Sequence, residues 1–227
     1  MGAALDLFNV LHEPTAVFGR VKEKPQVLVP WLVTCVFLTV LAVLSRPYQA
    51  AAMDAIRATL TPEQAARIPP GSTPVWRTIV GTPVVSIISL LAGSGLLWLG
   101  ATLAGGQTRF KSVMSVLCYS NMTYVIFAAV TMIVLSVRGV GAIGSFQDLR
   151  APLGLDLLAS GASPFLGQLL NGINPFSIWG VWLCGTGISI TQGMSRASGI
   201  LVTALAFLVG LLLTSAPLLL FSMGSRQ

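Results

Sequence analysis

Charged residues are scarce in this sequence. Of its 227 residues, 9% are Asp, Glu, Lys or Arg and 54% are hydrophobic. A soluble domain carries about 25% charged residues, because charged side chains cover much of a surface that faces water. The composition therefore excludes a soluble enzyme and a disordered tail, and it predicts a polytopic membrane protein.

Cysteine and histidine are also rare. Cys35, Cys118 and Cys184 lie inside apolar runs without C-x-x-C spacing, so they are expected to be buried thiols. This pattern excludes a disulfide-rich secreted module. His12 is the single histidine and precedes Glu13. Adjacent residues point apart on a helix, so the pair is interpreted as surface side chains rather than a metal or acid/base site.

The remaining reactive groups do not converge. Asp148 and Asp156 lie eight positions apart in one loop, with no nucleophile or further ligand near them in sequence. The motifs G-x-S-x-G, H-E-x-x-H and G-x-x-x-x-G-K-[ST] do not occur. We therefore expect no enzyme activity, no catalytic residue, no metal and no cofactor. The net charge of +6 is scattered as single and paired basic residues, which argues against a nucleic-acid partner.

Long apolar runs dominate the rest of the chain. A membrane helix needs about 20 mainly apolar residues. The five runs that meet this test are Val27–Leu44, Ile79–Ala104, Val113–Val137, Phe176–Thr191 and Ala197–Phe221. The fourth is the shortest and is rich in Gly, Ser and Thr. We expect an all-α membrane protein, with five transmembrane helices packed as a bundle and short helices along the interface.

The basic residues predict the orientation of this bundle. Loops on the cytoplasmic side of a membrane are enriched in Lys and Arg. One set of connections is about twice as dense in basic residues as the other. It contains Arg20, Lys22, Lys24, Arg109, Lys111 and Arg196. The N-terminus is therefore expected in the cytoplasm and the C-terminus outside, with Arg109 and Lys111 anchoring a tight inner turn at anionic headgroups.

The chain is predicted to have two parts. Residues 1–26 form a cytoplasmic amphipathic segment, in which Leu5, Phe8, Leu11 and Phe18 share a helical face. That face suits the lipid surface and packing under the bundle equally well. Residues 27–227 form the bundle, with outer loops at about 45–78 and 138–175.

Both outer loops contain candidate docking surfaces. In the first, Thr61 and Gln64 form a predicted capping box for a short helix within Thr61–Arg67. In the second, an apolar helical face suggests an interfacial segment. Its members are Phe165, Leu166, Leu169, Leu170 and Ile173.

Small residues recur at helical spacing in two of the runs. Gly185, Ser189 and Gly193 form one stripe, and Ser89 and Gly93 repeat the spacing in the second run. Small side chains let helix backbones approach closely, so these positions are expected at helix contacts within or between chains.

No run carries an ionisable residue in its middle, which argues against a proton-driven transporter. Uncharged polar residues could still form a groove. The candidates are Tyr119, Asn121, Thr186 and Gln192.

Three segments together resemble the bacterial Yip1-domain family of integral membrane proteins. They are LFNVLHEPTAVFGRVKEKP, LAGGQTRFKSVMSVLCYSNMTYVI and NPFSIWGVWLCGTGISITQGMSRASGI. They are similar to that family's cytoplasmic lead, its tyrosine-bearing third helix and its glycine-rich fourth helix. Cys118 stands where eukaryotic members have a glycine. The resemblance implies five membrane helices, a cytoplasmic N-terminus and no catalysis.

Two functions follow as hypotheses. The first is a non-enzymatic membrane organiser or accessory subunit of a membrane complex. The resemblance implies an ABC-type exporter as that complex and the bacterial inner membrane as the location. The partners would be the lipid bilayer, other membrane proteins such as exporter subunits, or further copies of the chain. The alternative is a protein that handles lipid or transports a neutral solute through the polar groove named above.

Overall fold

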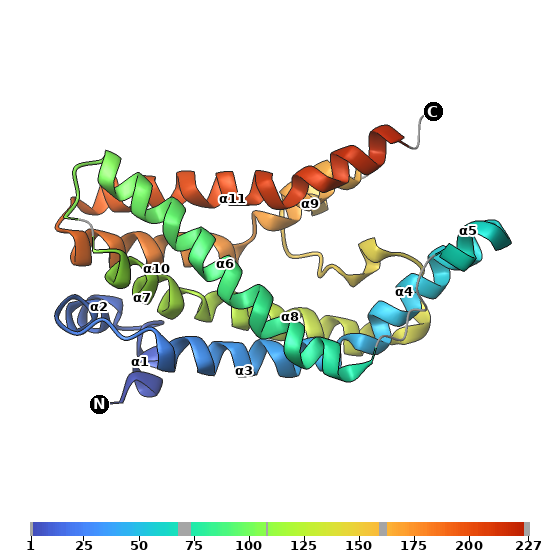
Figure 1. The fold of residues 1–227 in the computed structure, drawn as a ribbon, viewed down its shortest axis with the longest axis horizontal. Helices are drawn as coiled ribbons and strands as arrows, with labels where there is room; N and C mark the ends of the chain where they lie inside the picture. The colour runs from blue at the N-terminus through green and yellow to red at the C-terminus, as the bar shows by residue number, and fades with distance from the viewer. Residues whose placement is uncertain (1, 68–73, 108, 159–162, 225–227) are drawn as a thin grey trace.

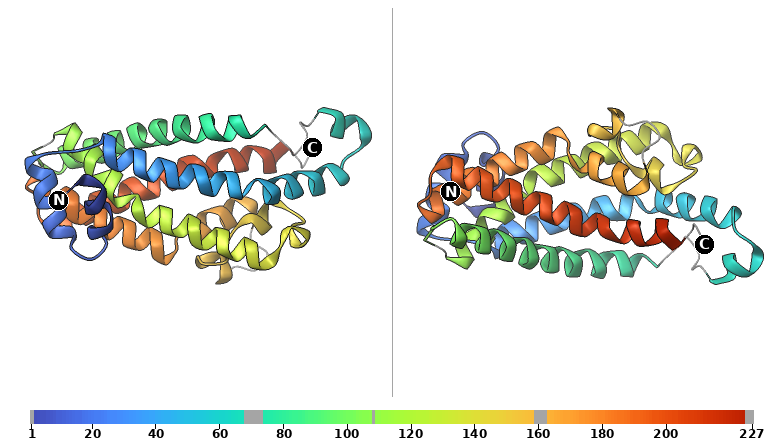
Figure 2. Two further views of the ribbon diagram at one scale, coloured as in Figure 1. Left: turned by 90° about the horizontal axis from the view of Figure 1, so that it is seen from below. Right: turned by 90° about the horizontal axis from the view of Figure 1, so that it is seen from above.

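The helices run back and forth along one long axis (Figures 1 and 2). The computed structural model describes residues 2–67, 74–107, 109–158 and 163–224. Within these ranges every regular element is helical. The first two helices lie at one end of the molecule, called here the N-terminal end. The last helix finishes at the opposite, distal end (Figure 1).

Three stretches of the described chain are long and apolar enough to cross a membrane. They are α6 (Val75–Leu103), the nearly continuous pair α7 (Phe110–Ser120) and α8 (Met122–Arg138), and α11 (Arg196–Gly224), which qualifies over Arg196–Pro217. A fourth results if α3 (Leu28–Leu44) and α4 (Arg46–Ala58), which are bent by 47° relative to each other, are counted as one crossing. The described chain therefore has the apolar helices of a membrane protein, at the positions that its hydropathy predicted.

The remaining expected crossing corresponds to α10 (Pro175–Gln192). Asn174 begins it with a capping box, in which its side chain accepts the Ser177 N–H at 3.0 Å and the Ser177 hydroxyl lies 3.0 Å from the Asn174 N–H. Gly193 ends it in the left-handed conformation, with φ of +68°. This 18-residue helix is not among the candidate spans, because its Gly, Ser, Thr and Gln residues lower its hydropathy. Five crossings remain a prediction.

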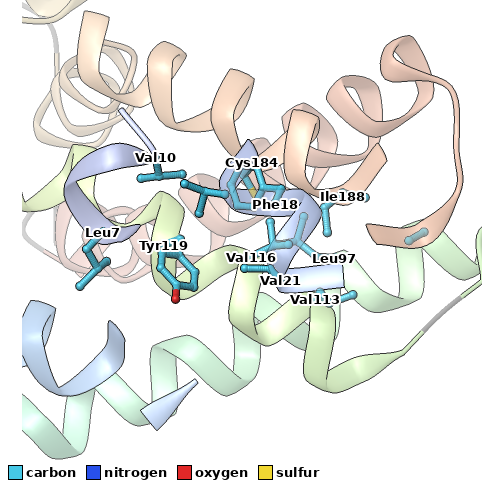
Figure 3. Close-up of a cluster of buried hydrophobic side chains, with 12 residues drawn as sticks. Leu7, Val10, Phe18, Val21, Leu97, Val113, Val116, Tyr119, Cys184 and Ile188 are labelled. Carbon is cyan, nitrogen blue, oxygen red and sulfur yellow. The ribbon is translucent and has the colours of Figure 1, made fainter. Parts of the chain in front are cut away.

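The main hydrophobic core lies at the N-terminal end. There α1 (Ala3–Asn9) and α2 (Pro14–Glu23) place Leu7, Val10 and Phe18 against α7 and α10 (Figure 3). The further buried members are Val17, Val21, Leu97, Ala101, Val113, Val116, Tyr119, Cys184 and Ile188. Residues 1–26 thus share a core with the bundle rather than forming a separate unit.

The expected apolar face of this segment is divided. Phe18 is fully buried, whereas Leu5 and Phe8 are exposed and Leu11 is half-buried. The prediction of one shared face was wrong, because α1 and α2 are separate helices with a turn between them, so that their registers differ. One part packs under the bundle and the other part is free to contact a lipid surface.

Short helices form the distal loops. In α5 (Pro62–Arg67) the predicted capping box is confirmed, since the Gln64 N–H lies 3.4 Å from the Thr61 hydroxyl and the Thr61 N–H lies 3.2 Å from the Gln64 side-chain oxygen. The described part of the second loop contains three 3-10 turns and one α-helix. They are η1 (Val140–Ala142), η2 (Phe146–Leu149), η3 (Leu155–Leu158) and α9 (Pro164–Gly172). Helix α9 packs against α11 and η3, and its position along the membrane interface stays a prediction.

Candidate functional site

The four residues of the predicted polar groove do not form one groove. Tyr119 is buried in the main hydrophobic core (Figure 3). Thr186 donates its hydroxyl hydrogen to the Trp182 carbonyl at 2.8 Å, one turn back on its own helix. Both side chains are therefore used in packing, and neither lines the large cavity described below.

Gln192 joins two turns at the N-terminal end. Its buried side-chain oxygen accepts the Arg109 backbone N–H at 3.0 Å, and its amide nitrogen donates to the Thr191 hydroxyl at 2.9 Å. Its backbone carbonyl also accepts the Gln107 N–H at 2.9 Å. Gln192 thus links the α6–α7 connection to the end of α10 by hydrogen bonds. Sequence spacing could not predict this pairing, because the partners lie 83 positions apart.

Asn121 is the member of the four that lines a cavity. It lies between α7 and α8, and its side chain makes no hydrogen bond with the described residues. An unpaired amide in an apolar medium is costly, so this side chain favours a polar ligand or water. Of the predicted groove, Asn121 therefore remains a candidate for ligand contact.

The cavity that Asn121 lines has a volume of about 870 Å³ and lies between α3, α6 and α8. Small side chains of α6 form one wall. They are Thr78, Gly81, Thr82, Ser86, Ser89 and Gly93. Larger apolar side chains form the opposite walls. They include Leu38 and Leu41 of α3, and Phe127 and Met132 of α8. Cavities that bind small ligands have similar volumes, about 300–1,000 Å³.

Polar groups gather where the cavity reaches the distal end. Arg77, at the start of α6, lies over the Trp76 ring with 5.7 Å between its guanidinium carbon and the ring centroid. Gln49 donates a side-chain N–H to the Ser45 hydroxyl at 2.9 Å. All of these except Trp76 line the cavity. Sequence reasoning missed this site, although the repeat of small residues along α6 was a signal for it.

The stripe of small residues on α10 meets α11. A Cβ on Gly185 would lie 2.6 Å from Ile200 Cα, and a Cβ on Gly199 would lie 3.0 Å from Ser189 Cβ, so both glycines permit close backbone approach. Gly199 was not among the expected contact residues. Gly193, which was, lies beyond the helix as its left-handed cap, and that prediction was wrong because the chain turns there.

The corresponding pair on α6 has two different environments. A Cβ on Gly93 would lie 3.0 Å from Leu117 Cδ2, so Gly93 is a close contact with α7. Ser89 is exposed and lines the cavity instead of packing against another described helix. The small side chain at position 89 therefore creates space rather than a helix contact.

Arg109 and Lys111 stay predicted headgroup anchors. Both side chains are exposed at the start of α7, at the N-terminal end of the bundle. Their position places two cations at one end of a candidate span, close to the turn that Gln192 holds.

An ion pair holds the N-terminal helices together. The Asp6 carboxylate is buried and accepts two hydrogen bonds from the Arg20 guanidinium, at 2.5 and 3.3 Å. The bond to Asp6 raises the pKa of Arg20 above its usual value. The two charges lie outside the candidate spans, so we interpret the pair as a clamp between α1 and α2.

Reactive groups do not cluster elsewhere in the described ranges. There, no group of three or more His, Cys, Asp or Glu side chains could hold a metal ion. Cys35, Cys118 and Cys184 are buried as free thiols. Asp148 accepts hydrogen bonds from the Gly144 N–H and the Ser145 hydroxyl, and it shapes its own loop.

Comparison with known proteins identifies the family of this chain. Residues 8–216 match the Yip1 domain, which spans nearly the whole chain. The chain is also similar to membrane protein YknW of Bacillus subtilis, with 26% identity over 196 residues, or 85% of this chain and 81% of YknW. No solved structure matches it. The apolar helices and the match over almost all of the sequence lead to one conclusion: the chain is an integral membrane protein that belongs to the Yip1 domain family.

Proposed function

We propose that this protein is a non-enzymatic subunit or organiser of a larger membrane complex. The observation that carries the proposal is α5, which has no buried residue and extends beyond the bundle at the distal end (Figure 1). A capped, charged helix that contacts little of its own chain is available to a partner. Helix α9 in the second outer loop offers less surface, because it packs against α11 and exposes Leu166 as a large apolar residue.

The hydrogen bonds of several buried polar side chains support a non-enzymatic role in contact with other proteins. Gln192, Thr186 and Ser189 are engaged in hydrogen bonds within the chain. An enzyme instead requires convergent groups that remain free to reach a substrate. Family membership favours the same function, and we propose an ABC-type exporter of the bacterial inner membrane as the complex.

Affinity purification from native membranes tests this proposal. A tagged chain with Glu63→Lys and Arg67→Glu reverses both charges of α5. The matched control reverses charges at the N-terminal end, with Glu13→Lys and Lys24→Glu, both exposed. We expect exporter subunits in stoichiometric amounts with the wild type and the control, and a loss of at least fivefold with the α5 variant. A lone chain in all three samples would overturn the proposal.

We further propose five crossings with the N-terminus in the cytoplasm. The support is the basic bias of the loops and the position of α1 and the end of α11 at opposite ends of the molecule. Single cysteines at Glu13 and Arg67, in a background without native cysteines, test it. A membrane-impermeant maleimide should label position 67 on intact spheroplasts and position 13 only after lysis. The reverse pattern would contradict the orientation.

The alternative function, lipid handling or transport of a neutral solute, was predicted to use the polar groove. Tyr119, Thr186 and Gln192 are held in the packed N-terminal half, so a continuous groove through these four residues does not exist in the described structure. The cavity that Asn121 lines remains a candidate site for a lipid or a neutral solute.

A further inference from the structure

We propose that the cavity between α3, α6 and α8 binds one anionic phospholipid from the leaflet at the distal end. The phosphate lies at Arg77, and an acyl chain lies along the small-residue wall of α6. This site is distinct from the exposed helix α5, and its occupation does not depend on a protein partner.

The walls of the cavity suit an acyl chain. Six small residues of α6 recur at spacings of one, three or four from Thr78 to Gly93, so they share one side of the helix. Opposite them, Leu41, Phe127 and Met132 present apolar surface. A hydrocarbon chain would cover both surfaces. Two of the hydroxyls that line them already have partners within the protein: Ser86 accepts the Trp31 indole N–H at 3.2 Å, and Thr131 donates to the Phe127 carbonyl at 2.9 Å.

The length of the cavity also fits a lipid of one leaflet. Gly93 follows Arg77 by 16 positions, which corresponds to about 24 Å of helix. One leaflet contributes about 15 Å of hydrocarbon and about 5–7 Å of headgroup region. A phospholipid with its headgroup at Arg77 would therefore extend along the wall toward the depth of Asn121, the unpaired amide at the inner part of the cavity.

The charge at the mouth selects an anionic headgroup. Among the described residues no carboxylate lies within 4.0 Å of the Arg77 guanidinium. Arg77 stacks on Trp76, and tryptophan is enriched at the headgroup level of membranes. A phosphate would pair with the guanidinium and reach the side chains of Gln49 and Ser45. An apolar partner helix in the cavity would leave this cation without a counter-charge.

Lipid binding by the purified full-length chain tests the proposal. The delipidated protein is titrated in mild detergent with phosphatidylglycerol or phosphatidylcholine, and native mass spectrometry counts the bound lipids. Gly81→Leu fills the cavity, because a Cβ at this position meets nothing within 4 Å. Gly95→Leu is the matched control, because its Cβ site is equally open but does not line the cavity. Arg77→Gln removes the cation, and Arg67→Gln is its exposed control.

We expect one tightly bound phosphatidylglycerol per chain and at least a fivefold preference over phosphatidylcholine. Gly81→Leu should weaken binding at least tenfold, and Arg77→Gln should reduce the preference to less than twofold. Both controls should bind as the wild type does. If Gly81→Leu does not fold, as judged by circular dichroism and gel filtration, Ser89→Leu replaces it, since Ser89 is exposed in the same cavity.

Three results would overturn the proposal. The first is that lipid binding is unchanged after Gly81→Leu fills the cavity. The second is that the wild type binds the two lipids equally. The third is that the purified chain carries no lipid and that its Gly81→Cys variant cross-links only to a protein in native membranes. The third result would identify a partner helix as the occupant. The charge reversals in α5, by contrast, should remove exporter subunits without changing lipid binding. The two proposals can therefore fail independently of each other.

Discussion

The side-chain oxygen of Gln192 accepts the backbone N–H of Arg109 at 3.0 Å, and this bond joins the end of α10 to the start of α7. The Gln192 side chain is fully buried. Its loss would leave a backbone donor without a partner inside the packed end of the protein. The bond thus fixes the relative position of two helices that contribute to the main core.

Replacing Gln192 should therefore destabilise the protein. Gln192→Met keeps the approximate size of the side chain but removes the acceptor, at an expected cost of about 1–3 kcal/mol. Thermal unfolding in detergent should show a lower Tm. Gln107→Ala is the control, because its side chain is exposed and its bond to Gln192 uses the backbone. An equal loss in both variants would contradict the assigned role.

Enlarging Gly199 should separate α10 from α11. A Cβ at this position would lie 3.0 Å from the Ser189 backbone nitrogen and Cβ, so Gly199→Leu forces the helices apart. Overpacking of this kind costs about 1–3 kcal/mol. Gly210→Leu on the same helix meets nothing within 4 Å and should leave the Tm unchanged. The assigned contact would be wrong if Gly199→Leu unfolded at the wild-type temperature.

Truncating Phe18 should loosen the N-terminal helices. Its ring is 0% exposed, and Phe→Ala changes in packed cores cost about 3–5 kcal/mol. Limited proteolysis should then cut near residues 10–24 in the variant under conditions that spare the wild type. Phe8→Ala is a suitable control, because Phe8 is 44% exposed. Equal resistance of the two variants would show that α2 does not depend on this contact.

The native cysteines should resist modification in the folded protein. Cys35, Cys118 and Cys184 are all less than 6% exposed. A maleimide added in mild detergent should label none of the three, and full labelling should follow unfolding in dodecyl sulfate. His12→Cys provides a positive control, because His12 is exposed. Rapid reaction of a native thiol before unfolding would contradict the packing around that cysteine.

The positions of the helices could be predicted from sequence, because a long apolar run must form helix in a membrane. The capping box of Thr61 and Gln64 could be predicted because it depends only on neighbours in sequence. The position of Gly193 could not be predicted in this way. Its spacing continued the stripe of Gly185 and Ser189, but Gly193 adopts the left-handed conformation and ends the helix, so it does not lie on the helical face of the other two.

The candidate site was predicted only in part, because it depends on how the helices are rotated against one another. Hydropathy does not determine this rotation. Asn121 and Tyr119 are two positions apart, so one can line a cavity while the other is buried in a core. Gln192 and Arg109 pair through a backbone atom, which leaves no signal in residue type. Small residues on α6 did leave a signal, but the same pattern is typical of helix contacts.

The burial of Phe18 between distant helices has a consequence for synthesis of the chain. Its core neighbour Ile188 follows 170 positions later. At about 5–20 residues per second, translation needs roughly 10–30 s to reach it. During that interval the apolar face of α2 has left the ribosome without the helix that will cover it. The nascent N-terminal helices therefore need another apolar surface, such as α7 or the membrane surface, until α10 is in place.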